Sequence, residues 1–266
     1  MKTLLVFVLA VRAGLAWASS GDLPVCPAPI SVGYYGCCYF RQGDGQGVDA
    51  EMFKALMARA GCDFQPYDMP RVRVWHQLNS RFLDMTSMGI ETGERSQYAW
   101  FLPYLATKYL VAYRAGRLAI REPADIVGDD RVVIGMVRSF KHGAVADSVI
   151  DAVRARRPDR IVEVADELTL FRLLKAGRVQ MVFAERHLFD YAVAALGIDD
   201  AVLTDIAPGE APVARCLVLS KVRFTEDEMR KWKRLLDGMV KDGTVRAILS
   251  RYVPAGDVAE MLASAR

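Results

Sequence analysis

The feature that most constrains this chain is an alternation of short β-prone runs and longer amphipathic segments, which occurs twice along the sequence. The expected strands comprise residues 30–34, 62–67, 84–90, 109–113, 132–137, 161–164, 181–184 and 213–219. Apolar residues at helical spacing follow many of these runs, as at residues 49–60 and 143–156. Alternating strands and helices predict an α/β fold in which each sheet is mostly parallel and flanked by helices.

Two such units in one chain predict two lobes. Lobe 1 is expected to comprise residues 19–113 and 216–266, and lobe 2 residues 114–215, with hinge segments near 114–120 and 205–215. A last helical block starts at Thr225, which forms a capping box with Glu228. Ligands of open α/β sheets bind beyond the carboxyl ends of the strands, so we expect the ligand cleft between the lobes.

Composition narrows the function classes. The chain has 35 Lys and Arg against 32 Asp and Glu, and 52% of its residues are hydrophobic. It therefore has enough apolar side chains to form a core, which excludes a disordered polymer. The small positive excess gives no reason to expect a nucleic-acid partner.

The N-terminus has the features of a secretory signal peptide. Met1 and Lys2 precede an apolar run at residues 3–11, and Ala16-Trp17-Ala18 provides a cleavage site. We expect cleavage near Ala18, so that residues 1–18 are removed and the protein is exported to the periplasm. The alternatives are an uncleaved membrane anchor and a mis-assigned start.

Export makes disulfides available, because they persist in oxidising compartments. Five cysteines is an odd number, so at least one is free or pairs between chains. Cys26 and Cys62 each lie just before a predicted strand. If a helix connects these strands in parallel, both cysteines lie at the same end of neighbouring strands, which favours a Cys26–Cys62 bridge. The alternative is that the thiols are simply packed in the core.

Several motifs occur in an order that is found in one protein family. They are GVDAE at residues 47–51, TGER at 92–95 with FLPY at 101–104, LKAGRV at 174–179 with FAE at 183–185, and a closing segment from Trp232 through DGT at 242–244 to Tyr252. In these motifs the chain resembles the periplasmic solute-binding proteins of amino-acid type, bacterial extracellular solute-binding protein family 3, from about residue 30 to 253. The resemblance implies the two-lobed type II periplasmic-binding-protein fold.

The resemblance also implies roles for two charged residues. Arg95, in the T-x-E-R motif, would bind the ligand carboxylate, and its planar guanidinium suits that task. The alternative is a surface arginine in a charge cluster with Glu94. Glu185, in the second lobe, would hold the ligand ammonium, and the alternative is an acid favoured at a helix N-terminus.

Further residues complete the implied site. Tyr35 is expected to stack on the ligand, and Thr92 to lie beside Arg95. Gly89 and Ile90 would contribute backbone contacts, although this chain is one residue short between Gly89 and Arg95. In the second lobe Ser139 would bind the carboxylate.

Two departures from the family pattern bear on the second lobe. Arg138 or Lys141 would add positive charge beside Ser139 and so favour a more acidic ligand. Gln180 stands where the family has an acid, which puts a structural contact of that acid in doubt.

No sequence feature indicates catalysis. His76, His142 and His187 have no metal-ligand spacing, and phosphate, dinucleotide and serine-hydrolase motifs are absent. We therefore expect no catalytic residues, no metal and no cofactor. The expected function is a monomeric periplasmic protein that captures an amino acid or related small carboxylate for an inner-membrane ABC permease. The alternatives are an exported enzyme similar to cyclohexadienyl or arogenate dehydratases, and a binding module that feeds a sensor.

Overall fold

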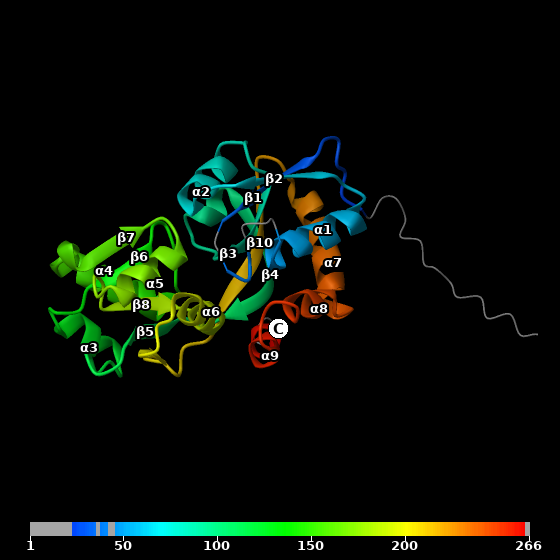
Figure 1. Ribbon diagram of the computed structural model, residues 1–266. Helices are drawn as coiled ribbons and strands as arrows, with labels where there is room; N and C mark the ends of the chain where they lie inside the picture. The colour runs from blue at the N-terminus through cyan, green and yellow to red at the C-terminus, as the bar shows by residue number, and fades with distance from the viewer. Residues whose placement is uncertain (1–22, 36–37, 42–45, 264–266) are drawn as a thin grey trace, which may run out of the picture.

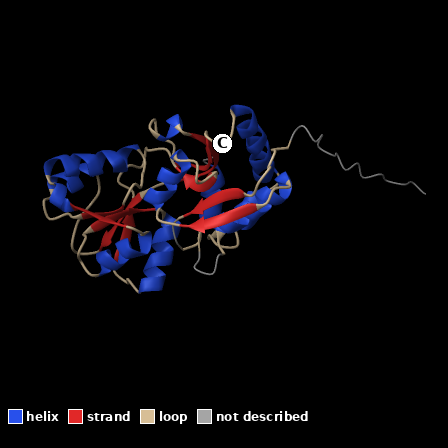
Figure 2. Ribbon diagram, turned by 90° about the horizontal axis from the view of Figure 1, so that it is seen from above, coloured by secondary structure: helices blue, strands red, loops and turns tan. Residues whose placement is uncertain are grey.

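The computed structural model describes residues 23–35, 38–41 and 46–263, and the predicted signal segment 1–18 lies outside them. The described residues form two five-stranded sheets, in the strand orders β2-β1-β3-β10-β4 and β7-β6-β8-β5-β9. Each sheet is the centre of one lobe with its own helices (Figure 1), and the view from above shows the two sets of strands side by side (Figure 2).

The first lobe combines the first half of the chain with its end. Its elements are β1 (Ile30–Tyr34), α1 (Val48–Ala60), β2 (Phe64–Asp68), α2 (Arg71–Asn79), β3 (Met85–Gly89), the 3₁₀ turn η1 (Arg95–Gln97), β4 (Ala99–Thr107), β10 (Val213–Ser220), α7 (Glu226–Lys241), α8 (Thr244–Leu249) and α9 (Ala255–Ala263). The predicted capping box of Thr225 and Glu228 is present at the start of α7. Trp232 of α7 is fully buried in the core of this lobe.

The second lobe is built from the middle of the chain. Its elements are β5 (Leu110–Arg114), α3 (Pro123–Gly128), β6 (Ile134–Val137), α4 (Ala144–Arg156), the 3₁₀ turn η2 (Pro158–Arg160), β7 (Ile161–Val164), α5 (Glu167–Lys175), β8 (Met181–Ala184), α6 (Arg186–Leu196) and β9 (Ala201–Thr204). The central strands β6 and β8 are buried along their whole length, as expected for strands covered on both faces.

The pairing confirms that each sheet is mostly parallel. In the first sheet β1 is parallel to both β2 and β3, whereas β10 is antiparallel to β3 and β4. In the second sheet β6 is parallel to β7 and β8, and β5 is antiparallel to β8 and β9. One strand of each sheet therefore runs against the others, and both reversed strands, β10 and β5, begin where the chain passes between the lobes.

The predicted lobe boundary near residue 113 is wrong. β5 belongs to the second sheet, where Val111 and Ala112 are fully buried. The chain therefore leaves the first sheet at residues 108–109, between β4 and β5, and returns at residues 205–212, between β9 and β10. The sheet that a strand joins depends on its pairing partners, which the local sequence of residues 109–113 does not show.

The long strand β4 was not predicted as a strand. It contains Pro103, which has no N–H group to donate to a ladder. β4 lies at the edge of its sheet and pairs only with β10 among the described strands, so the missing donor is tolerated.

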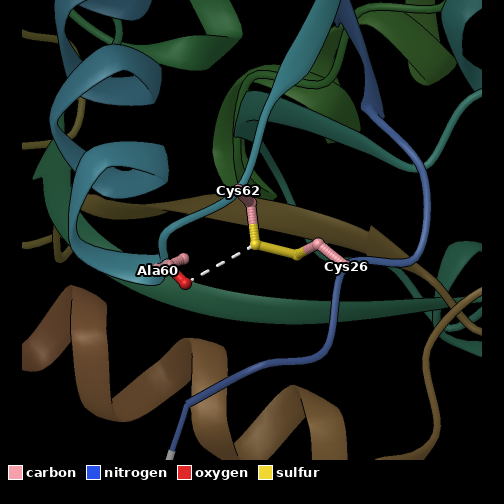
Figure 3. The surroundings of a disulfide bond; sticks show 3 residues. All are labelled: Cys26, Ala60 and Cys62. Carbon is pink, nitrogen blue, oxygen red and sulfur yellow. Dashed lines mark hydrogen bonds between the residues drawn. A yellow bond between two sulfur atoms is a disulfide. The ribbon is translucent and has the colours of Figure 1, made fainter.

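A disulfide joins Cys26 to Cys62, as predicted, with their Cα atoms 5.7 Å apart. β1 and β2 are parallel neighbours in which Ile30 lies opposite Phe64, so both cysteines precede the same end of the pair. Figure 3 shows the bridge beside Ala60, where α1 ends. The free cysteine among the described residues is Cys216, whose pKa is raised to about 12 by burial.

Two features of other classes of protein are absent from the described residues. No helix there has the length and apolarity needed to cross a membrane. Within the same residues no group of three or more His, Cys, Asp or Glu side chains could hold a metal ion.

Removal of the disulfide should destabilise the protein. The bridge closes a loop with a sequence separation of 36, so its loss frees chain entropy in the unfolded state. We expect the double substitution Cys26→Ser/Cys62→Ser to lower the free energy of unfolding by about 2–4 kcal/mol. Urea unfolding followed by circular dichroism measures this, with Cys216→Ser as the control for loss of a thiol. An unchanged unfolding midpoint in the double variant would contradict the prediction.

Candidate functional site

The cleft between the lobes lies beyond the carboxyl ends of β1 and β3 on one side and of β6, β7 and β8 on the other. A cavity between the lobes is lined by residues of both. The polar and aromatic residues that matter most are Tyr35, Asp49 and Arg71 from the first lobe and Phe140, Glu167 and Glu185 from the second. Strand ends of this kind are the usual ligand site of open α/β sheets.

Arg95 connects the two lobes across this cleft. Its Nη1 donates to the Ile90 carbonyl at 3.0 Å, and its Nη2 donates to the Ser139 carbonyl of the second lobe at 2.9 Å. The guanidinium lies over the Trp75 ring, 3.8 Å from its centroid. The side chain is buried, and burial lowers its pKa. Arg95 is therefore a buried cation held on the cleft face of the first lobe, rather than a surface arginine.

The backbone around Arg95 is shaped by neighbouring residues of the predicted site. Thr92 Oγ1 accepts a hydrogen bond from the Arg95 N–H at 3.2 Å and so helps to begin the 3₁₀ turn. Ser139 has a φ of 62°, a left-handed conformation that is uncommon for a residue with a Cβ. At Gly89, a Cβ would come within 2.3 Å of Val218, so this position needs glycine. The structure thus brings together Gly89, Ile90, Thr92, Arg95 and Ser139.

Tyr35 and Phe140 enclose a second arginine, which the sequence analysis did not predict. The guanidinium carbon of Arg71 lies 3.8 Å from the Tyr35 ring centroid and 3.7 Å from that of Phe140. Tyr35 is fixed by its hydroxyl, which donates to the Ser87 carbonyl at 2.7 Å. Because Tyr35 belongs to the first lobe and Phe140 to the second, Arg71 is a second cation held between the lobes.

Besides Glu185, two buried acids line the same cavity. Asp49 lies in the first turn of α1, and its Oδ1 has no hydrogen-bond partner among the described residues. Burial raises the pKa of Asp49 to about 7, although Ser87, Arg41 and Arg71 counteract this. Burial also raises the pKa of Glu167, at the start of α5. Both carboxyl groups therefore hold their protons more strongly than exposed acids do.

Glu185 lies at the hinge, where residues of the chain itself occupy it. Its Oε1 accepts hydrogen bonds from Thr107 Oγ1, at 2.5 Å, and from Arg215 Nη2. Its Oε2 lies 3.6 Å from His187 Nε2. Arg215 also donates from Nε to Thr107 Oγ1 at 2.8 Å and from Nη2 to the Tyr109 hydroxyl. The predicted ammonium partner is thus part of a buried ion pair between the lobes.

The charge state of this hinge cluster follows from its contacts. Burial by itself would raise the pKa of Glu185, but Arg215 and His187 lower it to about 2. Burial would lower the pKa of Arg215, but Glu185 and Tyr109 raise it above its ordinary value. Burial lowers the pKa of His187, although Glu185 counteracts this. Glu185 also lines a second pocket, together with Thr107 of β4, Leu110 of β5 and Met261 of α9.

The two departures in the second lobe have clear structural outcomes. Gln180 replaces a family acid, and its side chain accepts from the Val133 N–H at 3.1 Å and donates to the Gly177 carbonyl at 3.1 Å. It therefore joins two backbone segments. Arg138 forms an ion pair with Glu163 at 3.3 Å on the surface and does not line the cavity. The additional positive charge of the cleft comes from Arg71 instead.

Sequence reasoning missed Arg71, Glu167 and Arg215 as cleft residues. Only Arg71 carried a local signal. It begins α2 directly after Pro70, in a first turn with no acidic residue. A cation is disfavoured at that end of a helix by the helix dipole, so a buried arginine there suggests a role outside the helix.

Comparisons with known proteins agree with this architecture. The model of the family described as bacterial extracellular solute-binding proteins, family 3, matches residues 30–255. The chain belongs to this family. No curated protein sequence matches the chain.

Solved structures of similar fold include two amino-acid-binding proteins. The arginine-, lysine-, histidine-binding protein ArtJ from Geobacillus stearothermophilus is 19% identical with a TM-score of 0.71, covering 86% of this chain and 98% of ArtJ. The P235GK mutant of ArgBP from T. maritima is 19% identical with a TM-score of 0.68, and the match covers 84% of this chain and 94% of the ArgBP chain. A histidine kinase sensor domain with similarity to periplasmic binding proteins is 15% identical with a TM-score of 0.69, and the match covers 84% of this chain and 95% of the sensor domain. At these identities the likeness shows the fold.

The hinge ion pair generates a prediction about stability. The single substitution Arg215→Met leaves Glu185 buried without its cation, which should lower the free energy of unfolding by about 3–5 kcal/mol. The double substitution Arg215→Met/Glu185→Met removes both charges and should recover much of that loss. Urea unfolding of the wild type, the single variants Arg215→Met and Glu185→Met, and the double variant measures both effects. A double variant as unstable as the sum of its single variants would contradict a direct coupling.

Asp49 should make stability depend on pH. Its pKa is raised in the folded state, so the unfolded state loses the proton first as pH rises. The free energy of unfolding should therefore fall between about pH 4 and pH 7, by up to about 1.4 kcal/mol per pH unit from this group. Asp49→Asn should remove that fall. The free energy of unfolding of this variant, relative to that of the wild type, should therefore rise toward pH 8. Urea unfolding at pH 4.5, 6 and 8 tests it, with the exposed Asp151→Asn as control. Parallel pH profiles for wild type and Asp49→Asn would refute it.

Proposed function

We propose that this protein captures an amino acid or related small carboxylate in the periplasm and delivers it to an ABC-type importer of the inner membrane. The observation that carries the proposal is Arg95, a buried guanidinium on the first lobe that also contacts the backbone of the second. A carboxylate is the natural partner of such a planar fork of N–H groups. The amino-acid binders among the structures of similar fold support the same ligand class.

The proposed ligand contacts are divided between the two lobes, which implies that the lobes close on the ligand. Arg95, Thr92, Gly89, Ile90 and Tyr35 belong to the first lobe, whereas Ser139 and Glu185 belong to the second. A ligand that touches both sets gains its full contacts only when the lobes are closed. Ligand binding therefore shifts the population toward the closed state, which is the state that a permease would recognise.

The proposed contact between Glu185 and a ligand amine has a specific requirement. Glu185 already accepts from Thr107 and Arg215. An amine would have to share the carboxylate with these groups, so this contact is available only to a ligand that enters beside Arg215.

The carboxylate assignment is tested by substitution of Arg95. Arg95→Ala should weaken ligand binding at least 10-fold, because a charge-assisted pair and its cross-lobe connection are lost. Isothermal titration calorimetry, after a thermal-shift screen of amino acids and small carboxylates, measures the affinities. The exposed Arg73→Ala is the matched control. Equal affinity in wild type and Arg95→Ala would overturn the role of Arg95.

Two alternatives are separated by further measurements. Turnover of prephenate or arogenate by the purified protein would show an enzyme on the same fold and refute the binding role. The sensor alternative is favoured by the histidine kinase sensor domain of similar fold. Deletion of the gene should abolish uptake of the ligand if the protein serves an importer. Unchanged uptake with a lost transcriptional response would instead show a sensor.

A further inference from the structure

The guanidinium of Arg71, which lines the cavity between the lobes, has no ion-pair partner among the described residues. Arg71 is buried, at 6% exposure, and lines the cavity between the lobes. Its Nε has no hydrogen-bond partner, and within the described part of the chain the residue forms no ion pair. Its close contacts are the faces of Tyr35 and Phe140, which leave the edge of the guanidinium, with its N–H groups, unoccupied.

A buried charge without a hydrogen-bonded counter-ion is costly, so a cation in this position implies an anion from outside the chain. The acids that line the same cavity do not fill this role. Asp49 and Glu167 form no ion pair with Arg71 within the described residues, and burial raises the pKa of both although the charge of Arg71 counteracts this.

Glu185, the acid expected to bind a ligand amine, already has partners within the chain. Glu185 is compensated by Arg215 and hydrogen-bonded by Thr107, and all three side chains are buried. Arg215 thus stands where a ligand ammonium would have to bind. A zwitterionic ligand would bring a positive charge next to Arg215, toward a carboxylate whose charge Arg215 already compensates.

We infer that the cleft selects a dicarboxylate that lacks an ammonium group, with one carboxylate on Arg95 and the other on Arg71. The inference rests on the proposed function and names the ligand class within it. Tyr35 and Phe140 hold the Arg71 guanidinium flat, so its edge presents N–H groups to the second carboxylate in the paired geometry that arginine favours. Because Phe140 belongs to the second lobe, this contact also depends on closure.

The test compares three ligands that differ by one group each. Glutarate has two carboxylates, butyrate has one, and glutamate adds an ammonium group to the glutarate skeleton. Titration calorimetry on the wild-type mature protein should give an affinity for glutarate, or for succinate as the shorter homologue, at least 10-fold above those for butyrate and glutamate. Glutamate binding as tightly as the dicarboxylates would overturn the inference.

Variants of Arg71 locate the second carboxylate. Arg71→Gln should reduce dicarboxylate affinity at least 10-fold and change butyrate affinity less than 3-fold. Arg73→Gln, on the exposed side of the same helix, should change neither. Circular dichroism and the melting temperature check folding, and the wild-type comparison decides the ligand class even if Arg71→Gln does not fold. Dicarboxylate affinity within 2-fold of wild type in a folded Arg71→Gln would overturn the role of Arg71.

The outcomes also separate this inference from the proposed function. Binding of zwitterionic amino acids without binding of dicarboxylates would leave the proposed function standing and refute the inference. If no amino acid or small carboxylate binds, both are refuted.

Discussion

The ion pair of Arg215 and Glu185 at the hinge determines how the rest of the cleft is organised. Arg215 lies on β10 and Thr107 on β4, both in the first sheet, whereas Glu185 follows β8 in the second. Buried ions must be closely paired and hydrogen-bonded to offset their loss of hydration. Thr107 and Tyr109 complete that shell. The contact therefore joins the lobes at the point about which they would move.

This pair also decides which charges of the cleft are free to bind a ligand. The charge of Glu185 is compensated by Arg215, so two other guanidiniums of the cleft have no ion-pair partner among the described residues. Trp75 contacts that of Arg95, and Tyr35 and Phe140 contact that of Arg71. The other acids, Asp49 and Glu167, retain their protons more readily because they are buried. The inferred selection of an anionic ligand rests on this balance. The family shares its fold with amino-acid binders and a sensor domain, so such site-level differences, and not the fold, specify the ligand.

Much of the fold was predictable, because strands and helices with strong apolar periodicity show themselves locally. The Cys26–Cys62 bridge followed from the same pattern, since two cysteines before parallel strands lie at one end of the pair. β4 was missed because Pro103 is unfavourable in strands except at an edge. The lobe boundary was misplaced because nothing within β5 shows which sheet it joins. Arg95 and its neighbours came together as the family motif implied, although their ligand contacts stay a prediction.

By itself, the sequence determined the α/β alternation, the family and the position of Arg95, because each is carried by a local pattern of residues. Only the tertiary structure decided what Glu185 contacts and where Arg71 lies. Thr107 and Arg215 are 108 residues apart in the chain, and Arg71 meets Phe140 only across the cleft. Whether a charge is free or compensated depends on its distance to such partners, and this distance exists only once the two lobes have folded against each other.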